Sequence, residues 1–219
     1  MLHFQTFTVN QIFEHPYLVW DDTLETVIID PGFGSVRATD QLAAFIEKKG
    51  LRPVRCILTH AHFDHIMGAS FVRDKWGLEI EASSDEIGSL PSLMEQFAAM
   101  SMKVPEGVRE VELVPFRDEE QGQVRYGERT LRILKTPGHT AGGVSFFDQE
   151  AGALFTGDTL FTGDTLFAGG CGRTDLWGGD EAQLMHSIRE VLFVLPDETE
   201  VYPGHGPFTT IGEEKKNYK

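Results

Sequence analysis

Three histidines and an aspartate lie within six residues, directly after a short apolar run. The stretch reads VRCILTHAHFDH, so His60, His62, Asp64 and His65 follow an expected strand at 54–59. Side chains alternate along an extended segment, and His60 and His62 therefore point to the same side. If a helix begins in DHIMGASFVRDKWG, Asp64 and His65 lie in its first turn. We expect these four side chains to converge at the end of the strand.

Such a cluster is costly to bury unless it binds a metal ion. Polar and partly cationic groups lose hydration when they pack together, and a metal ion compensates for that loss. Imidazole nitrogens and carboxylate oxygens suit Zn²⁺, Fe²⁺ or Mn²⁺. The motif contains no thiolate, the ligand typical of closed structural zinc sites. The spacing therefore predicts a reactive metal site.

Two further histidines stand in tight turns that contain glycine and proline. TPGHT carries His139 and YPGHGP carries His205. Flanking glycines let the backbone turn sharply and expose the intervening side chain. Each motif follows an expected strand, so each histidine is placed at a strand end, where ligands can converge. His3, His15 and His186 lack such surroundings, and we expect them to lie outside the site.

The hexamer LFTGDT occurs twice in succession, in residues 154–167, and supplies two candidate aspartates, Asp158 and Asp164. Because six is even, both aspartates face the same side of a strand, and alternation cannot separate them. Counting forward from His139 favours Asp158, in a compact hairpin of GVSFF and ALFTG with its turn at 148–152. Counting back from GRTDL favours Asp164. We prefer Asp164, because the surplus residues then enlarge the hairpin tip, away from the metals.

The remaining pattern predicts one domain, residues 1–219, in which strands and helices are mixed. ETVIID (25–30) and RTLRILKT (129–136) are typical of strands. Thr39 is placed as the cap of a helix that stops at Gly50. Strands and helices do not alternate strictly, so we expect an α/β (α+β) fold without a doubly wound parallel sheet.

Two more helical stretches follow from apolar spacing. Residues 180–195 repeat leucine, isoleucine and valine at helical intervals, Asp180 and Gln183 resemble a capping box, and Pro196 ends the helix. PSLMEQFAAM (91–100) is interpreted as core packing.

Composition narrows the class of partner. The net charge of −15 argues against binding to nucleic acid or anionic membranes, which needs clustered Lys and Arg. No apolar run approaches the roughly 18 residues that span a bilayer, and the N-terminus MLHFQTFTVN does not resemble a signal peptide. The two cysteines, Cys56 and Cys171, do not indicate an oxidising compartment. We expect a cytoplasmic protein.

In their order, THAHFDH, TPGHT, TGD and YPGHGP resemble the motifs of the metallo-β-lactamase superfamily, and VIIDPG (27–32) and GRTDL (172–176) extend the similarity. The resemblance implies an αββα sandwich: two mostly antiparallel or mixed sheets, helices on the outer faces, and metals at one edge. It also implies two metal ions, with the TGD aspartate bridging both. One metal would lie on His60, His62 and His139, and the other on Asp64, His65 and His205.

GRTDL and the GHGPFTTIG tail are similar to short, single-domain type II glyoxalase-like (hydroxyacylglutathione hydrolase-like) enzymes. True β-lactamases carry a cysteine in place of the TGD aspartate, which argues against antibiotic hydrolysis. The resemblance implies hydrolysis of a small thioester by a metal-bound hydroxide, in a monomer or homodimer. Zinc is the preferred metal, with iron or manganese as alternatives. Asp64 would orient the nucleophile, and Arg173 would contact an anionic substrate or pair with Asp175.

Three other functions stay open. Persulfide dioxygenases also resemble the chain and hold a single iron with two histidines and an aspartate, here His60, His139 and the TGD aspartate. They typically have alanine where this chain has Phe63, which favours the hydrolase. A metal-dependent nuclease is disfavoured by the net acidity. A binding module without activity is disfavoured because such modules usually lose ligands. Longer glyoxalases add a helical domain that binds glutathione; we expect none here, which leaves the thiol carrier open.

Overall fold

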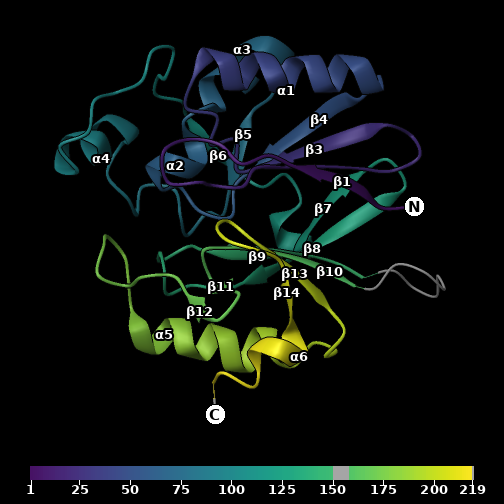
Figure 1. Ribbon diagram of the computed structural model, residues 1–219, viewed down its shortest axis with the longest axis vertical. Coiled ribbons are helices and arrows are strands. Elements are labelled where there is room, and N and C mark those ends of the chain that lie inside the picture. Colours follow the sequence, from purple (N-terminus) through teal and green to yellow (C-terminus); the bar gives the residue numbers. More distant parts are fainter. Residues whose placement is uncertain (150–157, 219) are drawn as a thin grey trace.

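Two six-stranded sheets face each other across the centre of the molecule, as the computed structural model shows for residues 1–149 and 158–218 (Figure 1). The first sheet has the order β1-β2-β3-β4-β5-β6. Its first two pairings are antiparallel and the remaining three are parallel. Its strands are β1 (His3–Thr6), β2 (Tyr17–Trp20), β3 (Glu25–Ile29), β4 (Arg52–Ile57), β5 (Ile80–Ala82) and β6 (Leu113–Pro115).

The second sheet has the order β14-β13-β10-β9-β8-β7. Among the strand pairs that the structure describes in this sheet, only β10–β13 is parallel. A small ribbon of β11 (Leu166–Phe167) and β12 (Gly170–Cys171) lies beside it. The strands of the second sheet are β7 (Gln123–Tyr126), β8 (Arg129–Lys135), β9 (Val144–Asp148), β10 (Thr159–Gly163), β13 (Glu200–Pro203) and β14 (Thr209–Thr210).

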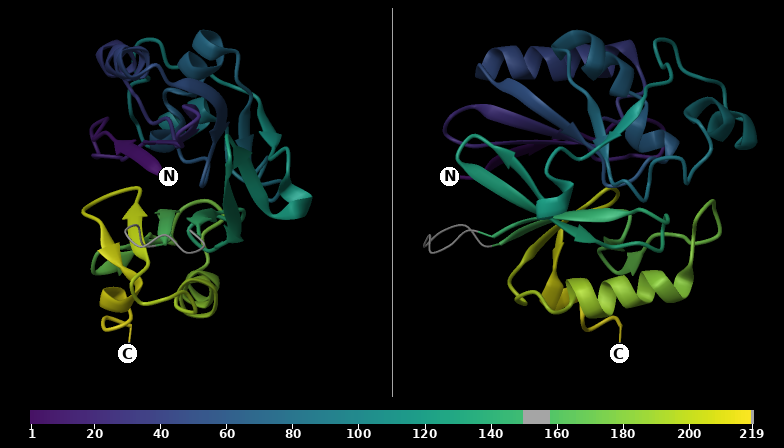
Figure 2. Two further views of the ribbon diagram at one scale, coloured as in Figure 1. Left: turned by 90° about the vertical axis from the view of Figure 1, so that its right-hand side faces the viewer. Right: turned by 180° about the vertical axis from the view of Figure 1, so that it is seen from behind.

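Helices cover both outer faces, which confirms the αββα architecture with two mixed sheets (Figures 1 and 2). The first sheet is covered by α1 (Val36–Lys49) and α3 (Ala69–Trp76), and the second by α5 (Glu181–His186), its π-helical continuation η2 (Ser187–Leu192), and α6 (Ile211–Glu214). The short helices α2 (Phe63–Ile66) and α4 (Leu93–Ala99) lie at one end, and η1 (Glu119–Gln121) precedes β7. Within the described residues, no helix has the length and apolarity needed to cross a membrane.

Strand alternation sorts the apolar side chains into three layers. In β3, Val27 and Ile29 pack between the sheets, whereas Ile28 packs towards α1 and α3. In β9, Phe146 faces the same central layer and Phe147 packs towards α5 and η2. Successive side chains of a strand point to opposite faces, so each sheet is buried on both sides. This explains why apolar runs rather than strict alternation mark strands such as β3 and β9.

Two helix starts test the capping predictions. Thr39 does not cap α1: the helix begins four residues earlier, at the extended N-cap Ser35, whose Oγ accepts a hydrogen bond from Ala38 N at 3.2 Å. Thr39 is buried inside the helix, where its hydroxyl donates to Val36 O. Gly50 ends α1 with φ 68°, as predicted. At α5, Asp180 Oδ1 accepts from Gln183 N at 2.9 Å, which supplies one half of the predicted capping box.

The helix expected in DHIMGASFVRDKWG is divided into α2 and α3. Gly68 stands at the break and donates its N–H to Pro31 O at 2.7 Å. A Cβ at Gly68 would lie 2.6 Å from the same oxygen, so only glycine allows this approach. Asp64 and His65 keep their predicted place in the first turn, now of α2.

The predicted hairpin has the wrong second strand. β9 pairs with β10, whose sequence is TLFTG, and Asp148 lies opposite Thr159. Residues 150–157, which hold most of the predicted turn and the whole ALFTG strand, lie outside the described residues. Both copies carry the same alternation, so the pattern alone could not select between them. The second copy forms the strand, and the connection from β9 spans residues 149–158.

Candidate metal centre

Five loops or short helices deliver the predicted ligands to one edge of the sandwich. His60 and His62 follow β4, and Asp64 and His65 lie in α2. The other three each follow a strand of the second sheet: His139 after β8, Asp164 after β10 and His205 after β13. Five of the seven ligands thus lie just beyond a strand end, where the backbone is free to turn towards the gap between the sheets, and Asp64 and His65 lie in the short helix that follows β4.

Three histidines from the two sheets form the first cluster. The ring centroids of His60, His62 and His139 lie 4.6 to 4.9 Å apart. His62 Nδ1 lies 2.8 Å from His139 Nε2, so these two nitrogens point at the same place. Three imidazoles that converge in this way can hold one metal ion.

The second cluster combines Asp64, His65 and His205. Asp64 Oδ2 lies 3.3 Å from His65 Nε2 and 3.2 Å from His205 Nε2. One donor atom from each residue lies within 4.8 Å of the others, so these three side chains can hold a second ion.

Asp164 lies between the two clusters. Its Oδ1 is 3.4 Å from His65 Nε2, and its Oδ2 is 3.6 Å from both His139 Nε2 and His205 Nε2. Asp158 is not brought to this place, because it precedes the opposite end of β10. Six residues of extended chain put the two aspartates about 20 Å apart. The geometry therefore places Asp164, and not Asp158, where a ligand shared by two ions would lie.

The donor atoms suit metal ions rather than further hydrogen bonds. The second ring nitrogen is engaged elsewhere in four of the histidines: His60 with Thr59 Oγ1, His65 with Asp30 Oδ2, His139 with Arg173 O, and His205 with Ile12 O, at 2.7 to 3.1 Å. Such bonds fix the tautomer and aim the other nitrogen at a metal. Among the described residues, four buried atoms of the site have no hydrogen-bond partner: His60 Nε2, His62 Nε2, His65 Nε2 and Asp164 Oδ1.

The histidines of the two clusters differ in how burial and neighbouring charges shift their pKa values. Burial lowers the pKa of His60 well below its usual value, and burial with the nearby His139 lowers the pKa of His62 to about 3. These rings are therefore neutral near pH 7, which is the metal-binding form. His65 differs: burial opposes its charge, but Asp64 and Asp164 raise its pKa well above the usual value. A proton and a metal ion thus compete for the second cluster.

Asp30 and Gln96, which lie outside the predicted ligand set, also hold the ligand loops. Asp30 Oδ1 accepts from Thr59 N at 2.7 Å, and Oδ2 accepts from Thr59 Oγ1 at 2.6 Å and faces His65 Nδ1 at 3.1 Å. Both oxygens are engaged, so Asp30 orients His65 although it lies within reach of the cluster. The DPG turn after an apolar strand was the signal that could have revealed it.

Gln96 is the second of these residues. Its Oε1 accepts from Phe63 N at 2.8 Å, and its Nε2 donates to Ala61 O at 3.0 Å. Both contacts hold the backbone of the histidine motif. Leu93 and Phe97 of α4 are buried, as the core interpretation of 91–100 predicts. The spacing of apolar residues in that helix does not indicate the role of Gln96.

Arg173 turns its side chain away from the cluster. Its guanidinium contacts Asp175 at 2.6 and 2.7 Å, and both side chains are more than half exposed. Only its carbonyl oxygen reaches the site, through His139 Nδ1. The contact of Arg173 with an anionic substrate stays a prediction.

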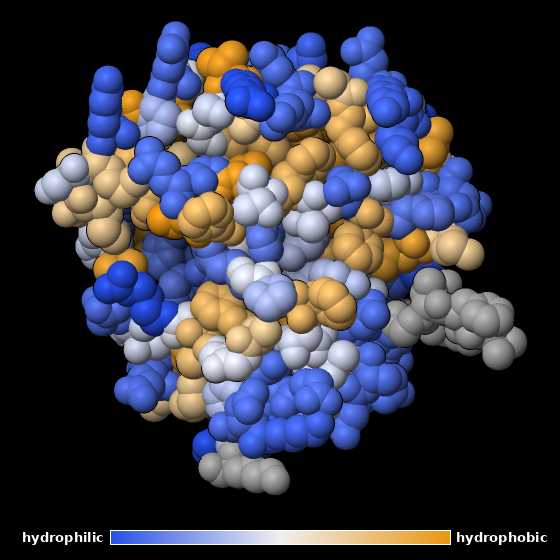
Figure 3. Space-filling model, viewed as in Figure 1, coloured by the Kyte–Doolittle hydropathy of each residue, from blue (hydrophilic) through white to orange (hydrophobic). Residues whose placement is uncertain are grey.

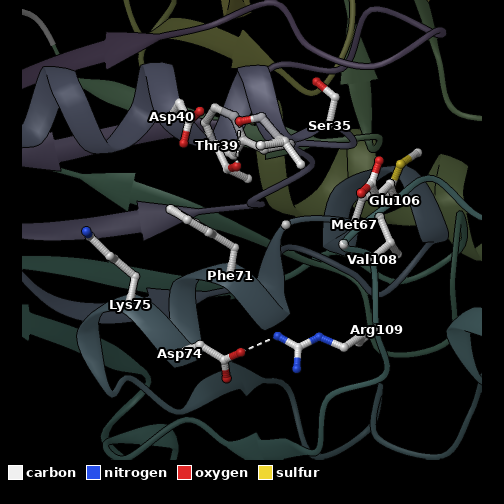
Figure 4. A pocket seen from close by; sticks show the side chains of 14 residues that line it. Ser35, Thr39, Asp40, Met67, Phe71, Asp74, Lys75, Glu106, Val108 and Arg109 are labelled. Atoms are coloured by element: carbon white, nitrogen blue, oxygen red, sulfur yellow. Dashed lines mark hydrogen bonds and ion pairs between the residues drawn. The ribbon is translucent and has the colours of Figure 1, made fainter.

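A cavity of about 370 Å³ lies between α1 and α3, apart from the two ligand clusters. That cavity has Phe71 on its floor and the Asp74–Arg109 ion pair at its rim, and it contains none of the predicted ligands (Figure 4). Beside His205, by contrast, the segment with Ile12 and Phe13 is exposed and apolar, with Phe13 68% exposed. Figure 3 shows several apolar patches on this face of the molecule, separated by polar residues.

Curated relatives share most of their length with this chain. It is 36% identical over 199 residues to the probable metallo-hydrolase YqgX of Bacillus subtilis, covering 91% of this chain and 87% of the relative. It is 33% identical to the hydroxyacylglutathione hydrolase GloC of Haemophilus influenzae, covering 91% and 89%. It is 30% identical to the human mitochondrial persulfide dioxygenase ETHE1, covering 91% and 68%.

Solved structures and a family model agree. The BLEG-1 B3 metallo-beta-lactamase superposes with a TM-score of 0.82 at 31% identity, covering 98% of this chain and 97% of the other. A di-iron-bound form of TTHA1623 gives 0.78 at 31% identity, covering 97% and 98%. The model of the Metallo-beta-lactamase superfamily matches residues 11–205. With this coverage and these His/Asp clusters, the chain belongs to the metallo-beta-lactamase superfamily, as one of its metal-dependent hydrolases.

Proposed function

We propose that the chain is a binuclear metal-dependent thioester hydrolase of the glyoxalase II type. The position of Asp164 carries this proposal: one carboxylate lies within 3.6 Å of ring nitrogens from both clusters. A ligand in that place suits two ions held side by side. His60, His62 and His139 would hold the first ion, and Asp64, His65 and His205 the second.

When bound, two such ions lower the pKa of a coordinated water towards neutrality and polarise the carbonyl of an ester or thioester. We propose zinc, because imidazole and carboxylate donors without thiolate fit a catalytic zinc site. Iron or manganese suits the same donors, and the di-iron form of a similar structure supports iron as the alternative.

The protein's own groups orient the reaction. Asp64 Oδ2 faces His65 and His205, and burial of the carboxylate opposes its ionisation. His65 and the hydrogen bond from His205 nevertheless keep the pKa of Asp64 below its ordinary value. Asp64 therefore stays an acceptor at neutral pH and can hold a nucleophilic water by one of its protons.

The substrate class is proposed from the relatives and from the rim of the site. The relative GloC is a hydroxyacylglutathione hydrolase, a thioesterase, and covers nearly the whole chain. Ile12 and Phe13 give an apolar rim beside His205, suited to the carbon-rich part of an acyl thioester. The net charge of −15 disfavours a nuclease.

A persulfide dioxygenase is the second candidate, because a relative of that name is 30% identical. It would need one iron on His60, His139 and Asp164, and the structure brings these three together. Such an enzyme would leave His62, Asp64, His65 and His205 without a metal to bind.

Asp64 separates the two candidates, because it belongs to the binuclear set and not to the single-iron triad. The experiment measures bound metal, hydrolysis of lactoylglutathione, and oxygen uptake with glutathione persulfide, for the wild type and Asp64→Asn. We expect two metal ions, hydrolysis without oxygen uptake, and a loss of at least about 100-fold in kcat for Asp64→Asn. One iron with rapid oxygen uptake that survives Asp64→Asn would overturn the proposal.

A further inference from the structure

Glu86 is a buried carboxylate that joins the two ligand loops of the three-histidine cluster. It lies in the turn after β5 and is 1% exposed. Its Oε1 accepts from Ala61 N at 2.8 Å. Its Oε2 accepts from Thr140 Oγ1 at 2.8 Å and from Gly142 N at 2.9 Å. One side chain therefore holds both loops.

The residues that donate these hydrogen bonds to Glu86 lie beside the predicted metal ligands. Ala61 lies between His60 and His62, in the loop from the first sheet. Thr140 directly follows His139, in the loop from the second sheet. The three histidines must meet across the gap between the sheets, and within the described residues no strand of one sheet pairs with a strand of the other. One backbone bond, from Val144 N to Thr59 O at 2.9 Å, crosses the gap beside His60. Glu86 supplies a hydrogen-bonded link at the level of the ligands themselves.

Close packing reinforces the link. A Cβ at Gly142 would lie 2.1 Å from Glu86 N, so the second loop approaches the Glu86 backbone as only glycine allows. All three partners of the carboxylate are donors, and both of its oxygens act only as acceptors. Buried hydrogen bonds to a charged group are the stronger kind and are costly to leave unmade.

We propose that Glu86 is a positioning residue that fixes the distance between the His60–His62 loop and the His139 loop, and so preorganises the three-histidine cluster for its metal ion. The inference rests on the proposed metal centre and not on the thioester reaction. Glu86 touches neither the ion nor the substrate, and it acts through Ala61, Thr140 and Gly142.

Glu86→Gln is the sharpest variant, because it keeps the size of the side chain and replaces one acceptor oxygen by a donor. The new amide then faces Ala61 N or the Thr140 and Gly142 donors, and one set of bonds is lost. Glu119→Gln is the matched control. Glu119 Oε1 accepts from Ser84 N at 2.8 Å, so it supports the same turn without touching either ligand loop.

The experiment titrates metal-free protein with Co²⁺ against a chelator and follows the visible absorption of the bound ion. We expect the affinity of one equivalent to fall about 10- to 100-fold in Glu86→Gln, the usual effect of losing an outer-shell partner. Its absorption band should shift, and Glu119→Gln should match the wild type. Thr140→Val removes one of the three bonds and should give a smaller loss, which keeps the test available if Glu86→Gln does not fold.

Wild-type affinity in both Glu86→Gln and Thr140→Val would overturn the inference. An equal loss in Glu119→Gln would also overturn it, since the stability of the turn would then explain the effect. Failure of the wild type to bind two equivalents would contradict the proposed binuclear function instead. The two failures are thus distinguishable.

Discussion

Asp164 contacts histidines of both clusters, whereas Asp158 precedes the opposite end of β10. Loss of an outer-shell partner alone weakens metal binding about 10- to 100-fold, and loss of a shared ligand should cost more. We expect Asp164→Ala to lose at least one of two bound ions, and Asp158→Ala to keep both. Elemental analysis after gel filtration measures the difference. Equal loss from both variants would show that the single shared ligand is a wrong assignment.

Gly163 permits the close approach of β10 to the histidine motif. It has φ 49°, and a Cβ there would lie 2.2 Å from Thr59 Oγ1, the atom that faces His60 Nδ1 at 3.0 Å. We expect Gly163→Ala to lower the free energy of unfolding by about 1–3 kcal/mol through overpacking and strain, and to weaken metal binding. Urea unfolding and chelator competition test both effects. The control is Gly170→Ala, whose Cβ would meet nothing within 4 Å; an identical effect there would refute the explanation.

At the scale of single residues, the spacing of the histidines in the sequence predicted most of the site. Two imidazoles two residues apart on an extended chain must share a side, so His60 and His62 could be predicted from the sequence. The shared aspartate could not be derived, because an even repeat leaves the side chains of both copies on the same face. Asp30, Gln96 and Glu86 act through contacts between residues far apart in the chain, which no local pattern encodes.

The turns between strands connect the two sheets at the edge far from α2. Asp21, in the β2–β3 turn, accepts from Thr23 N at 2.9 Å and from Glu128 N, in the β7–β8 turn, at 2.6 Å. Gly127 makes room for it, since a Cβ there would lie 2.3 Å from an Asp21 oxygen. Burial opposes ionisation of Asp21, but the hydrogen bonds from Thr23 and Glu128 lower its pKa overall.

A lowered folded pKa stabilises the protein above the ordinary value of 3.8, and this stabilisation is lost as the pH falls through the folded value. We therefore expect Asp21→Asn to reduce the free energy of unfolding by about 1–3 kcal/mol at pH 7, and the difference from the wild type to shrink below pH 4. Urea titrations of metal-free protein at pH 7 and pH 3 measure this change. Asp40→Asn, an exposed carboxylate on α1, is the control. A difference that does not depend on pH would contradict the assignment.

At the scale of elements, composition predicted the strands better than the boundaries of helices. Short runs rich in β-branched residues located β3 and β4, whereas the alternation of polar and apolar residues located β8, which is only partly buried. The start of α1 was misplaced, because serine and threonine are both good caps and only the extended backbone at Ser35 decides between them. The break at Gly68 depends on Pro31, which comes from another part of the chain.

At the scale of the whole molecule, the order of the strands could not be derived from hydrophobic patterning. Each sheet mixes parallel and antiparallel pairs, and β10 pairs with β13, about 40 residues further along the chain. The sandwich was expected from the resemblance of the motifs to those of the family. The three apolar layers explain why this arrangement is stable. The site lies where loops from both sheets meet, so the fold and the metal centre depend on each other.

The doubled hexamer provides a test at this scale. Removing residues 154–159 or 160–165 gives the same chain, since the copies are identical. In the present structure ten residues, 149–158, connect Asp148 to Thr159. In the single-copy chain Ala153 takes the place of Thr159, and four residues, 149–152, make the connection. The remaining LFTGD then continues as β10, with its aspartate at the position of Asp164.

We expect the single-copy chain to bind the same number of metal ions as the wild type and to keep its activity. The shorter connection should raise the free energy of unfolding by about 0.8 kcal/mol, because closing a connection of ten residues costs more entropy than closing one of four. Metal analysis and urea unfolding measure both quantities. If the deletion removed a bound ion, the first copy would contribute to the metal centre; if it destabilised the fold, the longer connection would contribute to packing. Unchanged metal binding would instead mean that one copy of the hexamer suffices and that Asp164 alone serves as the shared ligand.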